Sequence, residues 1–332
     1  MTIYAAITGW GLAVPDSLVT NADLERRIDT SDEWIRTRTG ILQRYVAAPH
    51  EATSTFAIAA GRQALERAGV AADKVDLVVL ATCTPDRPFP ATACTVQAAL
   101  GLHHAGAFDL GAACSGFVYG LHVATGLVRS GLHRTVLLVA ADIFTRYINW
   151  NDRNTAVLFG DGAGAVVLQA TTQPLGLLAS NIGAWGEGED LMAVDAGGSR
   201  LPLSPELLAQ GRQYVYMNGR EIFRHAVRGM AESSLRAIAD AGLQPNQVDC
   251  IIPHQANLRI IEALAKRLNM PRAQIVVNLD HYGNTSAASV PIALAEAVAA
   301  GQLCAGQYAL LTAFGGGLTW ASGIIRWGQV IE

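Results

Sequence analysis

The chain has 332 residues, of which 51% are hydrophobic and 16% are charged, and its formal net charge at pH 7 is −4. A disordered chain needs the opposite balance, so we expect a folded protein with a large core, a sizeable subunit interface, or both. A slightly acidic chain offers no electrostatic basis for binding nucleic acid or an anionic membrane. At about 150 residues per domain, the length predicts two domains.

The cysteines and the hydropathy bear on the compartment. The five cysteines are Cys83, Cys94, Cys114, Cys250 and Cys304. None are spaced as CxxC, and an odd number without a signal peptide indicates free thiols, a reducing compartment and no metal site. The longest weakly polar stretch, residues 287–300, is too short to span a bilayer. We therefore expect a soluble, cytoplasmic protein with no membrane or nucleic-acid partner.

The N-terminal part of the chain contains a glycine-rich stretch that could suggest a nucleotide site. Gly9-Trp10-Gly11-Leu12-Ala13-Val14 follows a predicted strand, but Pro15 and a loop come next. No helix N-terminus is therefore available for a pyrophosphate. Residues 54–67 then show apolar side chains at helical spacing and end at Ala-Gly. In residues 75–79 the run after Asp76 has no polar alternation, which is typical of a strand buried on both faces.

Cys114 is the strongest candidate for a nucleophile. A short strand ending at Leu110 enters the run Gly111-Ala112-Ala113, which is followed by Cys114 and then by a mostly apolar helical pattern. Small residues permit a tight turn between strand and helix, which would place Cys114 at a helix N-terminus. The free N–H groups and the macrodipole there favour the thiolate over the thiol. The other four cysteines fit buried structural thiols.

The middle of the chain contains a second glycine-rich stretch. It follows a buried strand predicted at residues 135–140 and fits GxGxxA at residues 160–165, but it leads into the apolar run 166–168, which is another strand. A connection between two strands gives no phosphate site, so we expect no nicotinamide cofactor. A boundary between two halves is predicted near residues 171–174, which divides the chain into residues 1–172 and 173–332.

The second half repeats the pattern of the first at a constant offset. A helical pattern covers residues 222–241, and the helix–turn–strand sequences around Gly69 and Asp76 recur at Gly242 and Asp249, 173 residues later. The strand at 135–140 recurs at 308–313 with the same offset. Two matches at one offset indicate a duplication. The predicted class is α/β, with two pseudo-equivalent halves built on parallel strands.

Three features of the second half could assist a thiol at Cys114. His254 directly follows a buried strand, at the end of the sheet where α/β proteins place their sites. Asn284 lies in Tyr282-Gly283-Asn284-Thr285-Ser286, near the counterpart of Cys114. The glycines of Phe314-Gly315-Gly316-Gly317 let backbone N–H groups approach a ligand closely. Pseudo-twofold symmetry would bring Cys114, His254 and Asn284 to one central cleft.

These residues together resemble the β-ketoacyl-[acyl-carrier-protein] synthase III family of thiolase-fold condensing enzymes. The resemblance covers nearly the whole chain. Its motifs are TSDEWI at 30–35 with RTGI at 38–41, GAACSG at 111–116, Asp152-Arg153 with FGDGAG at 159–164, Met217-Asn218-Gly219 with Phe223, HQANLR at 254–259, YGNTS at 282–286 and FGGGLTW at 314–320. The resemblance implies a duplicated fold layered α-β-α-β-α.

The resemblance also implies a reaction. Cys114, His254 and Asn284 would form the catalytic triad, and Cys114 would take the acyl group of an acyl-CoA. Malonyl-[acyl-carrier protein] would then lose CO2, and its enolate would attack the acyl-cysteine. Neutral donors from His254 and Asn284 would hold the enolate oxygen, and the backbone N–H groups of Cys114 and Gly316 would form the oxyanion hole. CoA thioester and malonyl-carrier protein are substrates, and no cofactor is implied.

Further residues receive binding roles from the same resemblance. Trp34 and Arg153 would stack on the CoA adenine, Thr30 would contact the base and Arg38 the phosphates. Phe223, Ala256 and Asn257 would line the pantetheine channel, Gln255 and Arg259 would belong to the docking face for acyl carrier protein, and Phe89 and Phe314 would shape the acyl pocket. Phe89 would act across the interface of a homodimer. Thr30 and Glu33 also fit a capping box.

One departure and three alternatives stand beside this interpretation. Trp185 occupies a position where the family more often has an acidic residue, which leaves the conformation of its loop open. An acyltransferase of secondary metabolism would use the same cysteine to make an ester, amide or quinolone. A papain-like cysteine hydrolase would need a Cys–His ion pair, and a non-catalytic acyl-CoA-binding protein would not need a thiol at Cys114.

Overall fold

A computed structural model describes residues 2–328 of the chain. Nine strands form one hydrogen-bonded sheet in the order β11-β12-β13-β8-β1-β7-β6-β4-β5. The first half supplies β1 (Tyr4–Ala13), β4 (Leu77–Ala81), β5 (Gly106–Leu110), β6 (Thr135–Asp142) and β7 (Gly162–Thr171). The second half supplies β8 (Gly176–Ala184), β11 (Cys250–Pro253), β12 (Tyr308–Gly315) and β13 (Thr319–Arg326). Only the pair Ala5–Gly176 joins β1 to β8, so the sheet consists of two parts.

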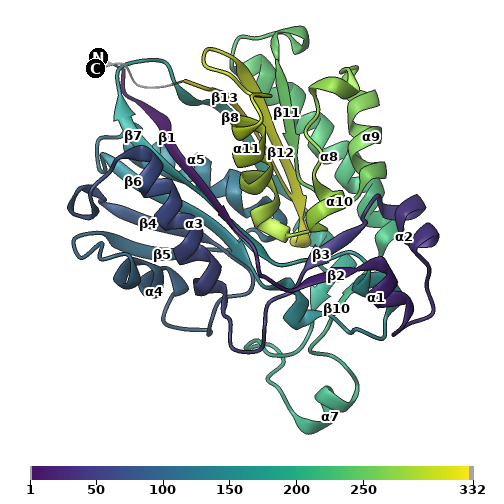
Figure 1. Cartoon of the computed structure of the whole chain (residues 1–332). Coiled ribbons are helices and arrows are strands. Elements are labelled where there is room, and N and C mark those ends of the chain that lie inside the picture. The colour runs from purple at the N-terminus through teal and green to yellow at the C-terminus, as the bar shows by residue number, and fades with distance from the viewer. Residues whose placement is uncertain (1, 329–332) are drawn as a thin grey trace.

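Six helices cover the two parts of the sheet in layers (Figure 1). The helices α3 (Thr53–Ala68) and α4 (Thr92–Ala99) pack on the outer face of the first part. The helices α5 (Gly116–Arg129) and α11 (Ser289–Ala299) lie between the two parts in one core. The helices α8 (Gly219–Asp240) and α9 (Leu258–Leu268) cover the second part. The order of layers is α-β-α-β-α, which confirms the predicted thiolase-like class.

The duplication extends to the bounds of individual elements. The first and last residues of β6 and β12 differ by 173, and so do the first residues of α5 and α11. Each of these helices follows a 3-10 turn, Ala113–Ser115 or Ser286–Ala288, whose first residue has a positive φ, 44° at Ala113 and 52° at Ser286. The counterpart of Cys114 is therefore Ala287, three residues beyond Asn284. The boundary between residues 172 and 173 stays a prediction, because one sheet runs through both halves.

The halves also differ. The strand β5 has no equivalent in the second half, where Ile275 makes only an isolated bridge to Ile251. Two smaller sheets, five short α-helices and several 3-10 turns connect these elements. The sheets and α-helices are β2 (Leu18–Thr20) with β3 (Gln43–Tyr45), β9 (Met192–Val194) with β10 (Val215–Met217), α1 (Asn21–Glu25), α2 (Asp32–Thr39), α6 (Arg153–Ala156), α7 (Pro205–Ala209) and α10 (Leu279–Tyr282). Figure 1 shows α7 on the most protruding loop.

Both glycine-rich stretches have structural roles. A Cβ on Gly9 or Gly11 would lie 2.1 Å from a carbonyl oxygen of α3, so these glycines let the helix pack directly on β1. The strand predicted after Gly160 is confirmed as β7. Among residues 2–328, no helix combines the length and the apolar surface needed to cross a bilayer.

Candidate active site

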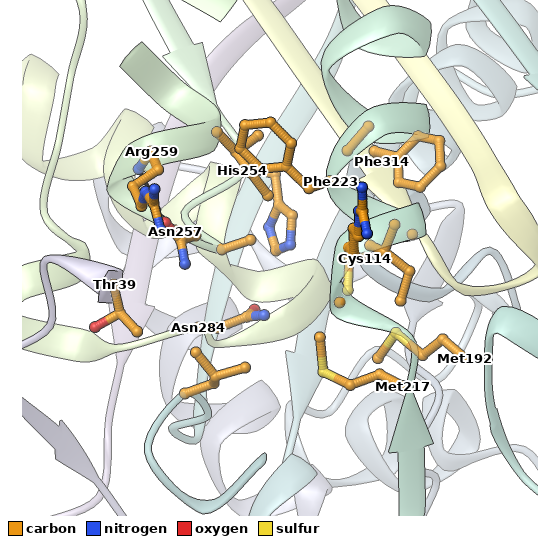
Figure 2. Close-up of a pocket in the computed structure, with 18 of the residues that line it drawn as sticks. Thr39, Cys114, Met192, Met217, Phe223, His254, Asn257, Arg259, Asn284 and Phe314 are labelled. Atoms are coloured by element: carbon orange, nitrogen blue, oxygen red, sulfur yellow. Dashed lines mark hydrogen bonds between the residues drawn. The ribbon is translucent and has the colours of Figure 1, made fainter. Parts of the chain in front are cut away.

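A cavity of about 730 Å³ lies where the two halves meet. Cys114 from the first half and His254 and Asn284 from the second all line it. Figure 2 shows the three side chains facing the same space, each from a different segment of the chain. The structure therefore brings together the three residues of the predicted triad.

Cys114 lies in the turn between β5 and α5, and it is 4% exposed. Its sulfur is 3.5 Å from Ser286 Oγ, in the equivalent turn of the second half. Gly315 lies against the same turn, and a Cβ on Gly315 would be 2.6 Å from the Cys114 nitrogen. Gly316 lines the cavity beside Cys114. The approach of two backbone segments requires a residue without a side chain at position 315.

The protonation states differ from the sequence-based expectation. Burial raises the pKa of Cys114 to about 12, and burial lowers the pKa of His254 to about 4. At neutral pH the resting site therefore holds a thiol and a neutral imidazole. The sequence favoured a thiolate at this helix N-terminus, whereas burial acts in the opposite direction and raises the pKa of the Cys114 thiol. A thiol and a neutral imidazole do not form the thiolate–imidazolium ion pair that a papain-like hydrolase needs.

His254 and Asn284 are held by hydrogen bonds that leave one polar group of each for the cavity. His254 follows β11, and its Nδ1 is 2.6 Å from Ser289 Oγ. Asn284 Oδ1 accepts a hydrogen bond from Ser286 N at 2.9 Å, so its amide NH2 is free to act as a donor. The backbone of Asn284 is fixed by bonds to Leu158 and Gly160, which adjoin the cavity.

A buried carboxylate that sequence reasoning missed links the segment after β4 to the turn that precedes α11. Asp142, at the end of β6, accepts hydrogen bonds from Thr82 Oγ1 at 3.0 Å and Ala287 N at 3.1 Å. It also accepts from Cys83 N and Thr84 Oγ1. The signal was present in the sequence, since a charged residue at the end of an otherwise apolar strand points to a specific role.

The cavity opens beside α2, where a cluster of cationic and aromatic groups lies. Trp34 and Arg38 line the cavity, and the Trp34 ring has Arg153 Cζ at 4.7 Å and Arg38 Cζ at 5.1 Å. Arg153 contacts the Trp34 ring but does not itself line the cavity. Thr30 precedes α2, and its buried Oγ1 has no hydrogen-bond partner among the described residues. The capping box of Thr30 and Glu33 is wrong, because Ser31 caps α2 through Trp34 N.

The predicted channel residues fall on one wall of the cavity. Phe223, Ala256 and Asn257 all line it, and Phe223 is 37% exposed at the mouth. Asn257 Nδ2 donates to Arg38 O at 3.1 Å and so ties α9 to α2. Arg259 is exposed beside them.

Gln255 does not belong to a docking surface, and that prediction is wrong. Its side chain is 1% exposed. Its Nε2 donates to Pro253 O, and its Oε1 accepts from Asn278 N. Both ends of the amide are thus satisfied inside the protein, where no carrier protein can reach them.

The inner end of the cavity is apolar. Phe314 is 6% exposed there and lines the cavity together with two methionines, Met192 and Met217. Met192 was not predicted, because it comes from a short strand remote in sequence from every motif. Phe89 is 83% exposed and does not line the cavity of its own chain.

The loop that carries Trp185 is anchored. Trp185 N donates to Leu318 O at 3.2 Å, and the Trp185 ring lies 4.7 Å from the His225 ring at an interplanar angle of 32°.

The layered fold and the buried thiol with its imidazole and amide define a condensing enzyme of the thiolase fold. Two family models match: "3-Oxoacyl-[acyl-carrier-protein (ACP)] synthase III" at residues 108–186 and its C-terminal model at residues 238–327. "Beta-ketoacyl-[acyl-carrier-protein] synthase III" of Roseiflexus sp. (strain RS-1) is 70% identical over 327 residues, which are 98% of this chain and 99% of that protein.

Two solved structures are also similar. The synthase III of Thermus thermophilus is 47% identical, with a TM-score of 0.92, over 98% of this chain and 100% of that chain. The synthase III of Aquifex aeolicus VF5 is 44% identical, with a TM-score of 0.91, over 97% of this chain and 100% of that chain. This chain belongs to the β-ketoacyl-[acyl-carrier-protein] synthase III family, and it is an acyltransferase.

Proposed function

We propose that this enzyme starts fatty-acid synthesis by joining an acyl-CoA primer to malonyl-[acyl-carrier protein] through an acyl-cysteine at Cys114. The observation that supports this proposal is the meeting of one buried thiol, one neutral imidazole and one free amide in a single cavity. Two neutral donors suit an enolate oxygen, whereas a hydrolase would need a base to activate water.

The first half-reaction transfers the acyl group. The Cys114 sulfur attacks the thioester carbonyl, and the oxyanion accepts hydrogen bonds from the N–H groups of Cys114 and Gly316. The C–S bond to CoA breaks, and the proton that left Cys114 goes with the CoA thiol. Burial disfavours a thiolate at Cys114. The acyl thioester is neutral, so its formation leaves no charge on the buried sulfur.

The second half-reaction forms the carbon–carbon bond. The malonyl carboxylate leaves as CO2, and its electron pair forms an enolate whose oxygen lies between His254 Nε2 and Asn284 Nδ2. The enolate carbon attacks the acyl-cysteine, the thioester bond to Cys114 breaks, and the sulfur takes one proton from solvent. The two substrates supply every atom of the product. Residues 2–328 contain no cluster of His, Cys, Asp and Glu that could hold a metal ion.

The mouth of the cavity suits the adenine and phosphate groups of CoA. Trp34, Arg153, Arg38 and Thr30 would hold the nucleotide end, and Phe223, Ala256 and Asn257 would hold the pantetheine arm. The Arg153 guanidinium lies over the Trp34 ring, so adenine would enter between these two groups and stack on both. Arg259 would meet the acidic carrier protein. If salt left the KM for malonyl-carrier protein unchanged, that contact would be excluded.

The exposed edge of the first half fits a homodimer. The strand β5 is the last strand of the sheet and is only half-buried, and Phe89 protrudes from the loop that follows β4. A second copy would cover both features and would bring its own Phe89 toward the acyl pocket near Phe314. Sedimentation of a monomer at micromolar concentration would contradict this assembly. All five cysteines are free, which suits a cytoplasmic location.

The test separates the two half-reactions. Incubation with acetyl-CoA should add one acetyl group to the intact protein, and Cys114→Ala should abolish the adduct. We expect His254→Ala and Asn284→Ala to keep the adduct but to lose at least about 100-fold in CO2 release from malonyl-carrier protein. Equal loss of both half-reactions would contradict the assigned roles. A panel of acyl-CoA primers in the same assay would then define the preferred chain length.

A further inference from the structure

The partner of the catalytic histidine is a hydroxyl group. His254 Nδ1 lies 2.6 Å from Ser289 Oγ, and no described carboxylate is within hydrogen-bond distance of the ring. Ser289 is the first residue of α11 and is 2% exposed. Gln255 N donates to the same oxygen at 3.3 Å, and the buried Gln255 side chain holds that segment in place. The hydroxyl is therefore fixed relative to the ring.

The direction of the bond follows from the hydrogen atoms available. Ser289 Oγ accepts the N–H of Gln255 and carries one hydrogen of its own. If that hydrogen points to Nδ1, the hydroxyl both donates and accepts, and the ring carries its proton on Nε2. If Nδ1 carried the proton, the Ser289 hydrogen would have no acceptor in its described hydrogen bonds. The first arrangement leaves fewer polar groups unpaired.

We propose that Ser289 is a positioning residue that holds His254 in the neutral tautomer with its proton on Nε2, aimed at the enolate oxygen. An aspartate at this position would do the opposite, because a carboxylate only accepts and would draw the proton to Nδ1. The bare Nε2 would then repel the enolate oxygen and could serve as a base for water. Ser289 thus favours condensation over hydrolysis. The inference rests on the proposed role of His254.

Few charges surround the ring. Burial is the one cause of the lowered His254 pKa, and no charged neighbour contributes. Three charged or titratable groups lie near the ring: Cys114 is a thiol at neutral pH, Arg259 lines the same cavity, and Glu296 of α11 accepts hydrogen bonds from Asn278 and Tyr282. The Asp142 carboxylate accepts a hydrogen bond from Ala287 N, in the turn before α11. A new carboxylate at position 289 would therefore be the dominant charge on the imidazole.

The first experiment removes and restores the hydroxyl. In Ser289→Ala we expect CO2 release from malonyl-carrier protein to fall about tenfold, with acetyl transfer to Cys114 unchanged, since one hydrogen bond orients the ring. Ser289→Thr retains the hydroxyl and should recover most of the rate. Unchanged CO2 release in Ser289→Ala, in a protein whose melting curve shows it to be folded, would overturn the proposal.

The second experiment compares Ser289→Asp with Ser289→Asn, which has the same size and no charge. We expect the wild-type enzyme and Ser289→Asn to release CO2 at a rate independent of pH between about 5.5 and 8. In Ser289→Asp the rate should fall as the pH rises through the raised pKa of His254, because the Nε2 proton is lost. Hydrolysis of the acetyl-enzyme should rise in the same variant. Identical pH profiles for the two variants would contradict the inference.

The outcomes also separate this inference from the proposed function. If the wild-type enzyme forms no acetyl adduct at Cys114, the condensation mechanism fails. If the adduct forms and CO2 is released, the mechanism stands, and the Ser289 variants decide the role of the hydroxyl alone. A 15N spectrum of the histidine rings gives a direct readout, with His254 Nδ1 unprotonated in the wild-type enzyme and protonated in Ser289→Asp.

Discussion

Equivalent turns in the two halves have different surroundings. The N–H of Ala287, in the second half, donates to the carboxylate of Asp142 at the end of β6. The counterpart of Ala287 is Cys114, and the counterpart of Asp142 is Gly315, which has no side chain. The same duplicated frame therefore caps one turn with a buried carboxylate and leaves the other open to a substrate oxygen. The comparison teaches that the proposed oxyanion site lies where the duplicated frame has a glycine in place of the carboxylate.

The largest effect is expected when the nucleophile is moved between the turns. Cys114→Ala should reduce condensation at least about 1000-fold, because no other thiol lines the cavity. Adding Ala287→Cys to this variant should not restore an acyl adduct, since the N–H at 287 is taken by Asp142 and the site is fully buried. Intact-protein mass spectrometry after acetyl-CoA is the measurement. An adduct at residue 287 would show that the duplicated fold alone is sufficient for acyl transfer, without a turn that is open to the substrate.

A smaller effect is expected when the open turn is closed. The Cβ of Gly315→Ala would lie 2.6 Å from the Cys114 nitrogen, so the turn must shift. We expect the rate of acetyl transfer to fall about 100-fold, as for the loss of one oxyanion donor. The matched control is Gly126→Ala in α5, where a Cβ meets nothing within 4 Å. Stopped-flow measurement should give a normal acylation rate in Gly126→Ala. A normal rate in Gly315→Ala would refute the claim that acyl transfer needs the open turn at Cys114.

The sequence predicted those parts of the molecule that depend on local pattern. The offset of 173 paired the strands that the structure shows as β6 and β12, because a duplication preserves spacing. The local sequence motifs identified Cys114, His254 and Asn284 as candidate site residues. The inward direction of Gln255, however, depends on partners in other segments, Asn278 among them, and spacing cannot show it. The effect of burial on the pKa of Cys114 escapes the sequence for a related reason, since desolvation is a property of the whole fold.

The smallest effect concerns the ends of the equivalent strands β4 and β11, where Ala81 is the counterpart of His254. Burial lowers the pKa of His254 to about 4 in the folded protein, so between pH 4 and 6.5 the unfolded chain binds more protons. The free energy of unfolding should therefore rise with pH across this window, by about 2 kcal/mol between pH 5 and 7 from this residue.

Replacing the histidine isolates this contribution. Burial raises the pKa of Asp161 to about 6, which gives the opposite slope, so only the difference between wild type and His254→Gln is informative. Urea unfolding at pH 5 and 7 should show that difference. Equal slopes would mean that folding does not shift the pKa of His254, so that at pH 5 the ring would carry protons on both nitrogens whatever Ser289 does. The neutral ring is thus a product of burial, and burial is what gives a hydroxyl partner control over the tautomer.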